Sequence, residues 1–252
     1  MSGASGAPDV TGAARTARLI LALDTATSRV VIALGDVAGS VLFEDGWTAG
    51  HRHGETLLPR LQELLSQAGV RIVDVSAIVV GTGPGTFTGL RVGLATAKAL
   101  AVSLDCPIVG IATAAALLDA DRAARASSAG ASSPGADDDR PAPAAVLVPA
   151  GPNDRVLIRA GAATLVPAGS EPDLDPGQDL VAVDLDGRAA AEASARGHAA
   201  LGGLAGALLR IGAARVASGD VDDVRTLVPE YVTLPRGIRE EHGTVEWSHS
   251  PA

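Results

Sequence analysis

The stretch "VVGTGPGTFTGLRVGLATAKALA", residues 79–101, decides the fold of this chain. It begins in a β-branched apolar segment that reads as a buried strand, passes through a glycine-rich loop, and continues as a helical pattern from about Thr88 to Leu104. A second apolar run around residues 107–111 supplies a further strand. The order of strand, loop, helix and strand predicts a β-loop-α-β unit and hence an α/β protein.

The glycine loop does not match the common phosphate-binding templates. A Walker loop needs a Lys before Ser or Thr at its end, and a dinucleotide fingerprint needs glycines at positions one, three and six. In "GTGPGTFTG" the sixth residue is Thr86 counted from Gly81 and Thr88 counted from Gly83. Two interpretations stay open: the helix start holds an anion through its free N–H groups, or the glycines permit a tight reversal with Phe87 as a packed plug.

The helix after the loop carries little bulk and little charge. Four small residues recur at every fourth position: Gly89, Gly93, Ala97 and Ala101. They leave one side of the helix almost without side chains, which lets another helix approach closely. Only Arg91 and Lys98 carry charge between residues 88 and 104, so we expect the helix to be covered nearly all round, by its own domain and by something else.

The residues before the loop predict a small meander and an amphipathic helix. From Arg18, "RLILALDTATSRVVIALGDVAGSVLFEDG" gives three β-rich runs, of which the first is nearly all apolar and therefore central in a sheet. In "HGETLLPRLQELLSQAG" (53–69) the leucines fall at helical spacing on one face. Pro59 is tolerated only near a helix start, which predicts that the regular helix begins close to Leu57 or Leu58.

Composition divides the chain into five segments. Residues 1–17 read as a disordered tail without the apolar region of a secretion signal, and residues 18–118 as the first lobe. Residues 119–144, rich in Ala, Ser and Asp, cannot bury enough apolar surface to offset their ordering entropy, so we expect a disordered insert. Residues 145–238 predict a smaller α/β lobe with a short meander and an Ala-rich helix, and residues 239–252 a flexible tail.

The overall composition excludes several classes of protein. With 252 residues, of which 47% are hydrophobic, the chain can bury a substantial core. A net charge of −9 without a dense basic cluster disfavours autonomous nucleic-acid binding. The longest apolar runs are far shorter than the roughly 20 residues that a membrane-spanning helix requires. The single cysteine, Cys106, agrees with a reducing compartment and is expected to pack rather than to react, so we expect a cytoplasmic protein.

Two further groups of residues invite a chemical interpretation. Asp24 ends the first strand and is followed by Thr25, which suits a magnesium–phosphate site and equally suits a turn capped by the carboxylate. His51, His53 and Glu55 are of metal-ligating types. The two histidines do not share a helix face, so capping and solvation are the simpler interpretation and no metal is expected. No nucleophile-elbow signature appears.

Three stretches closely resemble one known family. They are "LILALDTATSRVVIAL" (19–34), "HGETLLPRLQELLSQAG" (53–69) and "IVVGTGPGTFTGLRVGLATAKALA" (78–101). They resemble the bacterial TsaB family, also called YeaZ, of tRNA threonylcarbamoyladenosine biosynthesis proteins, over roughly residues 18–118. In the second half, "PEYV" (229–232) resembles the family's terminal Pro-x-Tyr signature, whereas the remainder matches poorly.

The resemblance implies an actin-like, Hsp70-like ATPase (ASKHA) fold of two lobes, each with a mixed β-sheet flanked by helices. It also implies a subunit without catalysis of its own. In the family this protein pairs with its paralogue TsaD, which transfers the threonylcarbamoyl group to adenosine 37 of tRNAs that read codons beginning with A, and the ATPase TsaE joins the pair. The resemblance implies no tightly bound cofactor, no membrane and tRNA contact mainly through the complex; ATP or ADP at the interface with TsaD, and a homodimer of the isolated chain, stay open.

Two groups of site residues follow from the resemblance. In the family, the helices that match residues 55–69 and 88–103 pack against the equivalent pair of TsaD or of a second copy. We therefore expect six residues in the partner contact: Leu57, Leu61, Leu64, Leu90, Leu94 and Ala97. A vestigial nucleotide site would use Asp24, Thr25, Gly83 and Gly85. The alternatives are an active ATP-dependent kinase or acyltransferase of the same fold, which would turn over ATP, and a metalloprotease, which would need a metal.

Overall fold

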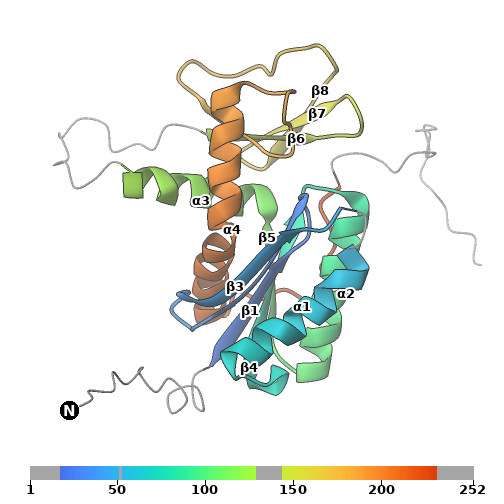
Figure 1. The fold of residues 1–252 in the computed structure, drawn as a ribbon, viewed down its shortest axis with the longest axis vertical. Helices are drawn as coiled ribbons and strands as arrows, with labels where there is room; N and C mark the ends of the chain where they lie inside the picture. The colour runs from blue at the N-terminus through green and yellow to red at the C-terminus, as the bar shows by residue number, and fades with distance from the viewer. Residues whose placement is uncertain (1–17, 51–52, 129–143, 232–252) are drawn as a thin grey trace, which may run out of the picture.

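The computed structural model describes residues 18–50, 53–128 and 144–231, which form two β-sheets and four α-helices (Figure 1). Across the first sheet the strands are β3 (Val41–Thr48), β2 (Arg29–Gly35), β1 (Leu19–Asp24), β4 (Val75–Gly83) and β5 (Ile108–Ala112). Across the second they are β8 (Ala162–Val166), β7 (Arg155–Arg159), β6 (Ala144–Pro149) and β9 (Asp179–Ala182). The helices are α1 (His53–Ala68), α2 (Phe87–Leu104), α3 (Thr113–Ser128) and α4 (Ala191–Ser218), and a 3-10 turn, Ile72–Asp74, precedes β4.

Both sheets are mixed. In the first sheet β1, β2 and β3 form an antiparallel meander, whereas β4 and β5 run parallel to β1. In the second sheet β6, β7 and β8 are antiparallel neighbours, and β9 runs parallel to β6. The predicted meanders and the predicted β-loop-α-β unit, here β4–α2–β5, are confirmed.

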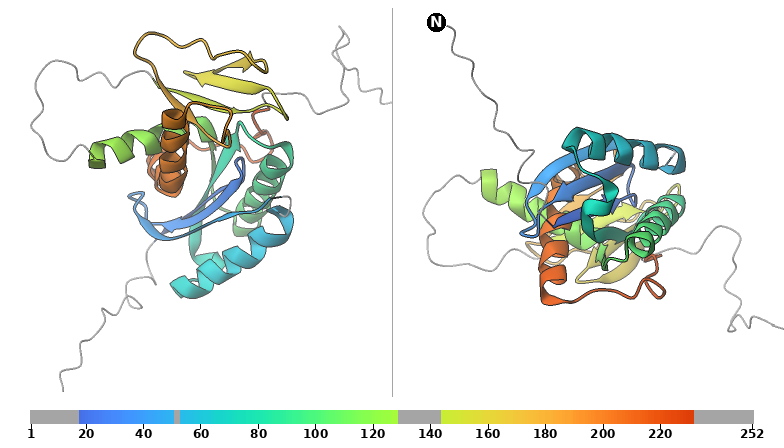
Figure 2. Two further views of the ribbon diagram at one scale, coloured as in Figure 1. Left: turned by 45° about the horizontal axis from the view of Figure 1, so that its top comes forward. Right: turned by 90° about the horizontal axis from the view of Figure 1, so that it is seen from below.

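Helices cover both faces of the first sheet, as Figure 2 shows. Side chains alternate along a strand, so Ile20 and Ala22 of β1 join the core under α3 and α4, whereas Leu21 and Leu23 join the core under α1 and α2. Every residue of β1 is buried. The nearly continuous apolar run that predicted a central strand therefore reflects burial on two sides.

Helix α4 extends over both sheets. It has 28 residues, which gives a length of roughly 40 Å. Its first half packs on the second sheet, where Gly197 lies against the carbonyl of Ala182, and its second half packs on the first sheet, where Gly212 lies against Val79. The predicted second lobe of residues 145–238 is therefore wrong in one respect: from the middle of α4 to Tyr231 the chain lies on the first lobe.

Part of the predicted disordered insert is helical. Helix α3 continues through residues 119–128, where Ala120 and Asp121 are buried. Arg196 of α4 donates two hydrogen bonds to the Asp121 carboxylate, at 3.1 and 2.7 Å, and Arg125 lies 3.4 Å from it. Alanine and arginine are good helix formers, and this ion cluster supplies the tertiary contact that composition alone does not reveal.

Helix α1 begins earlier than predicted. It starts at His53, so Pro59 lies in its second turn instead of its first. The proline removes one hydrogen bond, to the carbonyl of residue 55, at an exposed part of the helix where water can replace it. The first turn is also tied to β3, because the indole N–H of Trp47 donates to the hydroxyl of Thr56 at 3.1 Å.

Three predicted segments fall wholly or partly outside the described residues: the tail 1–17, the tail 239–252 and the part of the insert at 129–143. Within the described part, α2 and α4 are each long and apolar enough to cross a membrane by length and composition. The short apolar runs of the sequence did not predict this. Helix α2 packs on the first sheet and α4 on both sheets, and 33% of the window of α2 and 50% of that of α4 are buried within the described part of the chain.

Candidate partner-binding face and glycine-loop site

The carboxylate of Asp24 lies at the end of β1, completely buried. The backbone N–H of Ala26 donates to its Oδ1 and the hydroxyl of Thr113 donates to its Oδ2, each at 2.7 Å. Burial raises the pKa of Asp24 to about 6, although both hydrogen bonds favour the charged form. Of the two interpretations left open by the sequence, the structure has the carboxylate capping its own turn.

The glycines of the loop allow α2 to lie directly on that turn. A Cβ at Gly81 would overlap Asp24, one at Gly85 would overlap the carbonyl of Ala26, and one at Gly89 would overlap the carbonyl of Thr25. The Thr25 hydroxyl donates to the Gly89 carbonyl at 2.6 Å. Gly89 and Gly93 on the small side of α2 therefore face this chain's own β1–β2 turn, and Ala97 and Ala101 on the same side join the core over the first sheet, so this side does not face a partner helix as predicted.

The residues predicted for a vestigial nucleotide site do come together here. Gly85 lies against Ala26, the residue that follows Asp24 and Thr25, and the carbonyl of Glu230 lies close to Gly83 on the other side of the loop. A magnesium–phosphate group needs carboxylate oxygens that can reach the ion. Both oxygens of Asp24 are engaged within the chain and have no exposed surface, so the described residues do not fit that group in this arrangement.

All six residues predicted to contact a partner are buried within the chain. Leu57, Leu61, Leu64, Leu94 and Ala97 belong to the core between the first sheet and its two covering helices, and Leu90 is likewise only 1% exposed. That placement is a correction to the prediction. Apolar periodicity along a helix identifies the side that the chain itself buries, because that side is selected by its own sheet.

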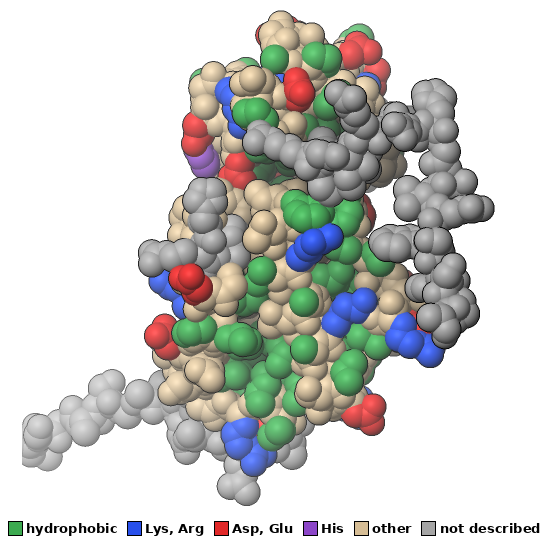
Figure 3. Space-filling model, turned by 90° about the vertical axis from the view of Figure 1, so that its right-hand side faces the viewer, with side chains coloured by type: hydrophobic (Ala, Val, Ile, Leu, Met, Phe, Trp, Pro, Cys, Tyr) green, Lys and Arg blue, Asp and Glu red, His purple; other side chains and the backbone are tan. Residues whose placement is uncertain are grey.

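The opposite sides of α1 and α2 form the solvent-facing surface, which we call the outer helix face. It includes Leu58 of α1, which is 50% exposed, and Val102 of α2, which is 66% exposed. Ala95 and Ala99 of α2 are also exposed on this face. Figure 3 views the molecule from the side where α1 and α2 lie in Figure 1 and shows apolar side chains gathered across the centre of this face. The list of residues predicted to contact a partner missed them, although Ala95, Ala99 and Val102 are positions out of phase with the small side of α2.

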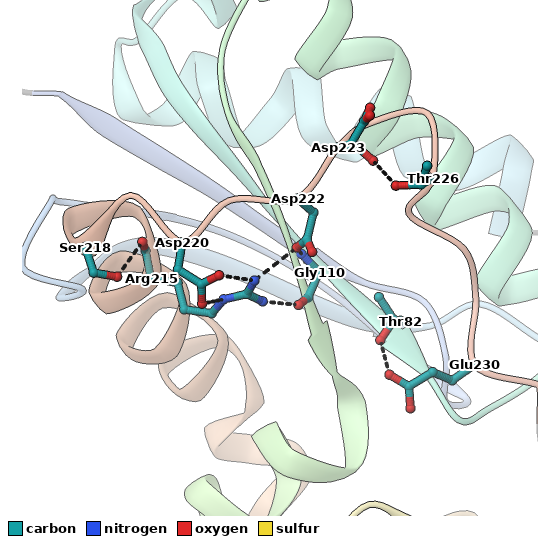
Figure 4. A network of polar contacts seen from close by, with 9 residues as sticks. All are labelled: Thr82, Gly110, Arg215, Ser218, Asp220, Asp222, Asp223, Thr226 and Glu230. Atoms are coloured by element: carbon teal, nitrogen blue, oxygen red, sulfur yellow. Dashed lines mark hydrogen bonds and ion pairs between the residues drawn. The ribbon is translucent and has the colours of Figure 1, made fainter.

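The chain after α4 forms what we call the C-terminal strap, residues 219–231. It crosses β5, where the Gly110 N–H donates to Asp222 at 2.8 Å and Arg215 donates to the Gly110 carbonyl at 2.7 Å (Figure 4). Arg215 also bonds to Asp220, at 2.7 Å from its Nε. The strap thus covers the open edge of the first sheet, which would otherwise present unpaired backbone groups.

The strap then runs beside α2 toward the glycine loop. Lys98 donates to the carbonyl of Leu227 at 2.8 Å, so one of the two charges of α2 is used within the chain. At the loop, the Glu230 N–H donates to the Thr82 carbonyl and the Thr82 hydroxyl donates back to Glu230, both at 2.8 Å. The "PEYV" signature hinted at this region, but no sequence pattern predicted that it packs against the loop.

The described residues contain no cluster of three His, Cys, Asp or Glu side chains that could hold a metal. His51 lies outside the described residues, so the expectation of no metal stays a prediction. Cys106 is partly buried, and burial and the nearby Asp105 raise the pKa of its thiol. Because a raised pKa disfavours the reactive thiolate, the placement agrees with a packing role.

Comparison with known proteins gives matches to about two fifths of the chain by sequence and to most of the chain by fold. Residues 47–136 match the family model TsaD, tRNA N6-adenosine threonylcarbamoyltransferase. The chain is 35% identical over 100 residues to the tRNA threonylcarbamoyladenosine biosynthesis protein TsaB of Escherichia coli, covering 37% of this chain and 40% of that protein. It is also 35% identical over 101 residues to TsaB of Haemophilus influenzae, covering 40% and 42%. The chain thus spans about two fifths of the length of these curated relatives.

The fold comparison extends further along the chain. YeaZ from Pseudomonas aeruginosa superposes with a TM-score of 0.61 at 23% identity, covering 85% of this chain and all of that one. This likeness shows that the chain shares the fold of that protein, and the two mixed sheets flanked by helices agree with the fold expected from the resemblance. By sequence in its first lobe, and by fold over most of its length, this chain resembles the TsaB (YeaZ) proteins.

Proposed function

We propose that this chain acts in the biosynthesis of threonylcarbamoyladenosine at position 37 of tRNAs that read codons beginning with A. Its role is that of a non-catalytic subunit, which pairs with the transferase TsaD and, through that pair, with the ATPase TsaE. The support is the resemblance of the first lobe to TsaB proteins of two bacteria. Such a role belongs in the cytoplasm, where tRNAs are modified.

The observation that carries the proposal is the outer helix face. Leu58 and Val102 leave half or more of their surface in water, and the alanines between them add apolar area without bulk. Burying apolar surface contributes about 25 cal/mol per Å², so a flat, weakly charged helix pair favours association with another one. The partner contact therefore uses the side of α1 and α2 opposite to the five leucines and one alanine first expected.

The absence of catalysis is part of the same proposal. An active kinase or acyltransferase of this fold would hold magnesium and phosphate at the end of β1. Asp24, the acidic residue there, is buried and fully hydrogen bonded. We propose that the isolated chain holds no nucleotide, and that any ATP or ADP in the complex is bound mainly by TsaD.

The test is co-expression with TsaD of the same organism, followed by size-exclusion chromatography. Ala99→Glu places a charge on the outer helix face and is expected to abolish co-elution with TsaD. Ala123→Glu changes an alanine of α3 that is also exposed, and serves as the matched control. Co-elution of the Ala99→Glu variant at the wild-type level would contradict the placement, and a wild-type chain that fails to bind TsaD would contradict the function. A wild-type chain that elutes as a dimer with TsaD absent would indicate that a second copy uses this face.

A further inference from the structure

We propose that Tyr231 and Glu230, at the end of the C-terminal strap, are positioning residues. They hold the first turns of α2 in place and so shape the outer helix face. The inference rests on the proposed function for its consequence, but its physical content concerns the isolated chain. The N-terminal end of α2 has few stabilising features of its own, and contacts from the strap compensate for this.

Helix α2 begins with few stabilising features of its own. Its N-cap residue, Thr86, makes no side-chain hydrogen bond to the first turn, and that turn holds no acidic residue to favour the helix dipole. Gly89 and Gly93 follow within the first two turns, and each glycine disfavours a helix by about 1 kcal/mol relative to alanine. The order of this end of α2 therefore depends on tertiary contacts.

On the inner side those contacts come from the β1–β2 turn. The Thr86 N–H donates to the Ala26 carbonyl at 2.7 Å, and the Thr25 hydroxyl donates to the Gly89 carbonyl. They fix how close α2 lies to the sheet. They do not reach the outer side, where Phe87 and Arg91 lie.

On the outer side the contacts come from the strap. The ring of Tyr231 lies 5.1 Å from the ring of Phe87, and the guanidinium of Arg91 lies over Phe87 at 3.9 Å. Arg91 also donates through Nε to the Tyr231 hydroxyl at 3.2 Å. The three side chains form a cluster, which we call the clasp, and it joins the first and second turns of α2 to the strap.

The strap is itself held on both sides of its crossing, so the clasp is preformed. Figure 4 shows Arg215, Asp220, Asp222 and Gly110 at one end and the Thr82–Glu230 pair at the other. Glu230 bonds to Thr82 through both its backbone and its side chain, which places the next residue, Tyr231, over Phe87. Because the strap already holds the Tyr231 ring in place, little conformational entropy is lost when the ring packs on Phe87. The contact can therefore stabilise the first turns of α2.

Hydrogen exchange on the isolated full chain tests the clasp directly. In Tyr231→Ala, the backbone amides of residues 90–93 are expected to exchange about five to thirty times faster than in the wild type, which corresponds to loss of the Phe87–Tyr231 ring contact and of the Arg91–Tyr231 hydrogen bond. The amides of β1 are expected to keep their wild-type rates. Tyr231→Phe keeps the ring and loses only the hydroxyl, so it is expected to restore most of the protection.

Arg225→Ala is the matched control, because Arg225 lies on the same strap, is mostly exposed, and among the described residues pairs through its side chain with Asp223. It is expected to exchange like the wild type. Wild-type exchange at residues 90–93 in Tyr231→Ala would overturn the inference.

Affinity for TsaD separates the inference from the proposed function. Tyr231→Ala is expected to bind TsaD more weakly than Tyr231→Phe, which is expected to approach the wild type. If the wild type binds TsaD but Tyr231→Ala binds equally well, the positioning role is wrong. If exchange changes as expected but the wild type does not bind TsaD, the clasp stands and the proposed function fails.

Discussion

Replacement of Asp24 by Asn tests the buried carboxylate at the centre of the glycine-loop site. Asp24 has no exposed surface, and burial raises its pKa from 3.8 to about 6 in the folded chain. Asn keeps the size of the side chain and cannot ionise. The variant therefore isolates the contribution of one titrating group to the free energy of unfolding.

The magnitude and sign follow from proton linkage. Between the unfolded pKa of 3.8 and the folded pKa of about 6, the folded state binds more protons than the unfolded state. The stability contributed by the neutral form is fully present below pH 3.8 and is lost as the pH rises through 6. At about 1.4 kcal/mol per pKa unit, the wild type is expected to lose about 3 kcal/mol relative to Asp24→Asn across this window.

Urea denaturation of both proteins at a series of pH values from 3.5 to 7.5 measures this difference. The other carboxylates are common to the two proteins, so their titration cancels when the unfolding free energies are subtracted. A pH-independent offset is expected from the altered hydrogen bonds to Thr113 and Ala26. A difference that stays flat across the window, or that grows in favour of the wild type as the pH rises, would refute the assignment of a buried carboxylate with a raised pKa.

Three further predictions concern packing, an ion cluster and ligand binding. Gly81→Ala is expected to prevent stable folding because its Cβ has no room. Gly54→Ala in α1, whose Cβ would meet only Val92 at an ordinary contact distance of 3.9 Å, is expected to raise the unfolding free energy by up to about 1 kcal/mol in urea titrations. Asp121→Ala is expected to cost about 1–3 kcal/mol, because it removes the buried carboxylate that Arg196 and Arg125 share while Arg196 keeps its ion pair with Asp179; the exposed Arg122→Ala is expected to cost less than about 0.5 kcal/mol, both read by thermal or urea unfolding. Calorimetric titration of the isolated chain with magnesium and ATP is expected to give no heat of binding at high micromolar nucleotide, and a clear binding isotherm would favour the kinase alternative.

Much of the fold could be predicted from the sequence because its signals are local. The apolar run of β1, the leucine spacing of α1 and the glycine loop before α2 each act through the residues next to them. These patterns gave the meanders and the β-loop-α-β unit correctly. The extension of α3 to Ser128 was missed because its stabilising contact, between Asp121 and Arg196, joins residues far apart in the chain.

The exposed side of α1 and α2 and the position of the strap could not be predicted from the sequence. A helix with apolar residues on most of its surface does not reveal which side its own sheet covers, so Leu94 and Ala97 were assigned to a partner and Val102 was overlooked. The strap was missed for a related reason. Its contacts with α2 and β5 use backbone groups, such as the carbonyl of Leu227 and the N–H of Gly110. Every residue type has such groups, so the sequence does not indicate which of them form contacts.

The length of α4 limits how this molecule can move. Two-lobed proteins that close around a ligand do so by rotating one lobe against the other at a few flexible residues. Here one continuous helix backs both sheets, so any such rotation would bend the helix or strip one of its halves from its core. The two lobes are therefore expected to move as one rigid body. Such a molecule is suited to presenting a fixed surface and poorly suited to opening and closing around a ligand.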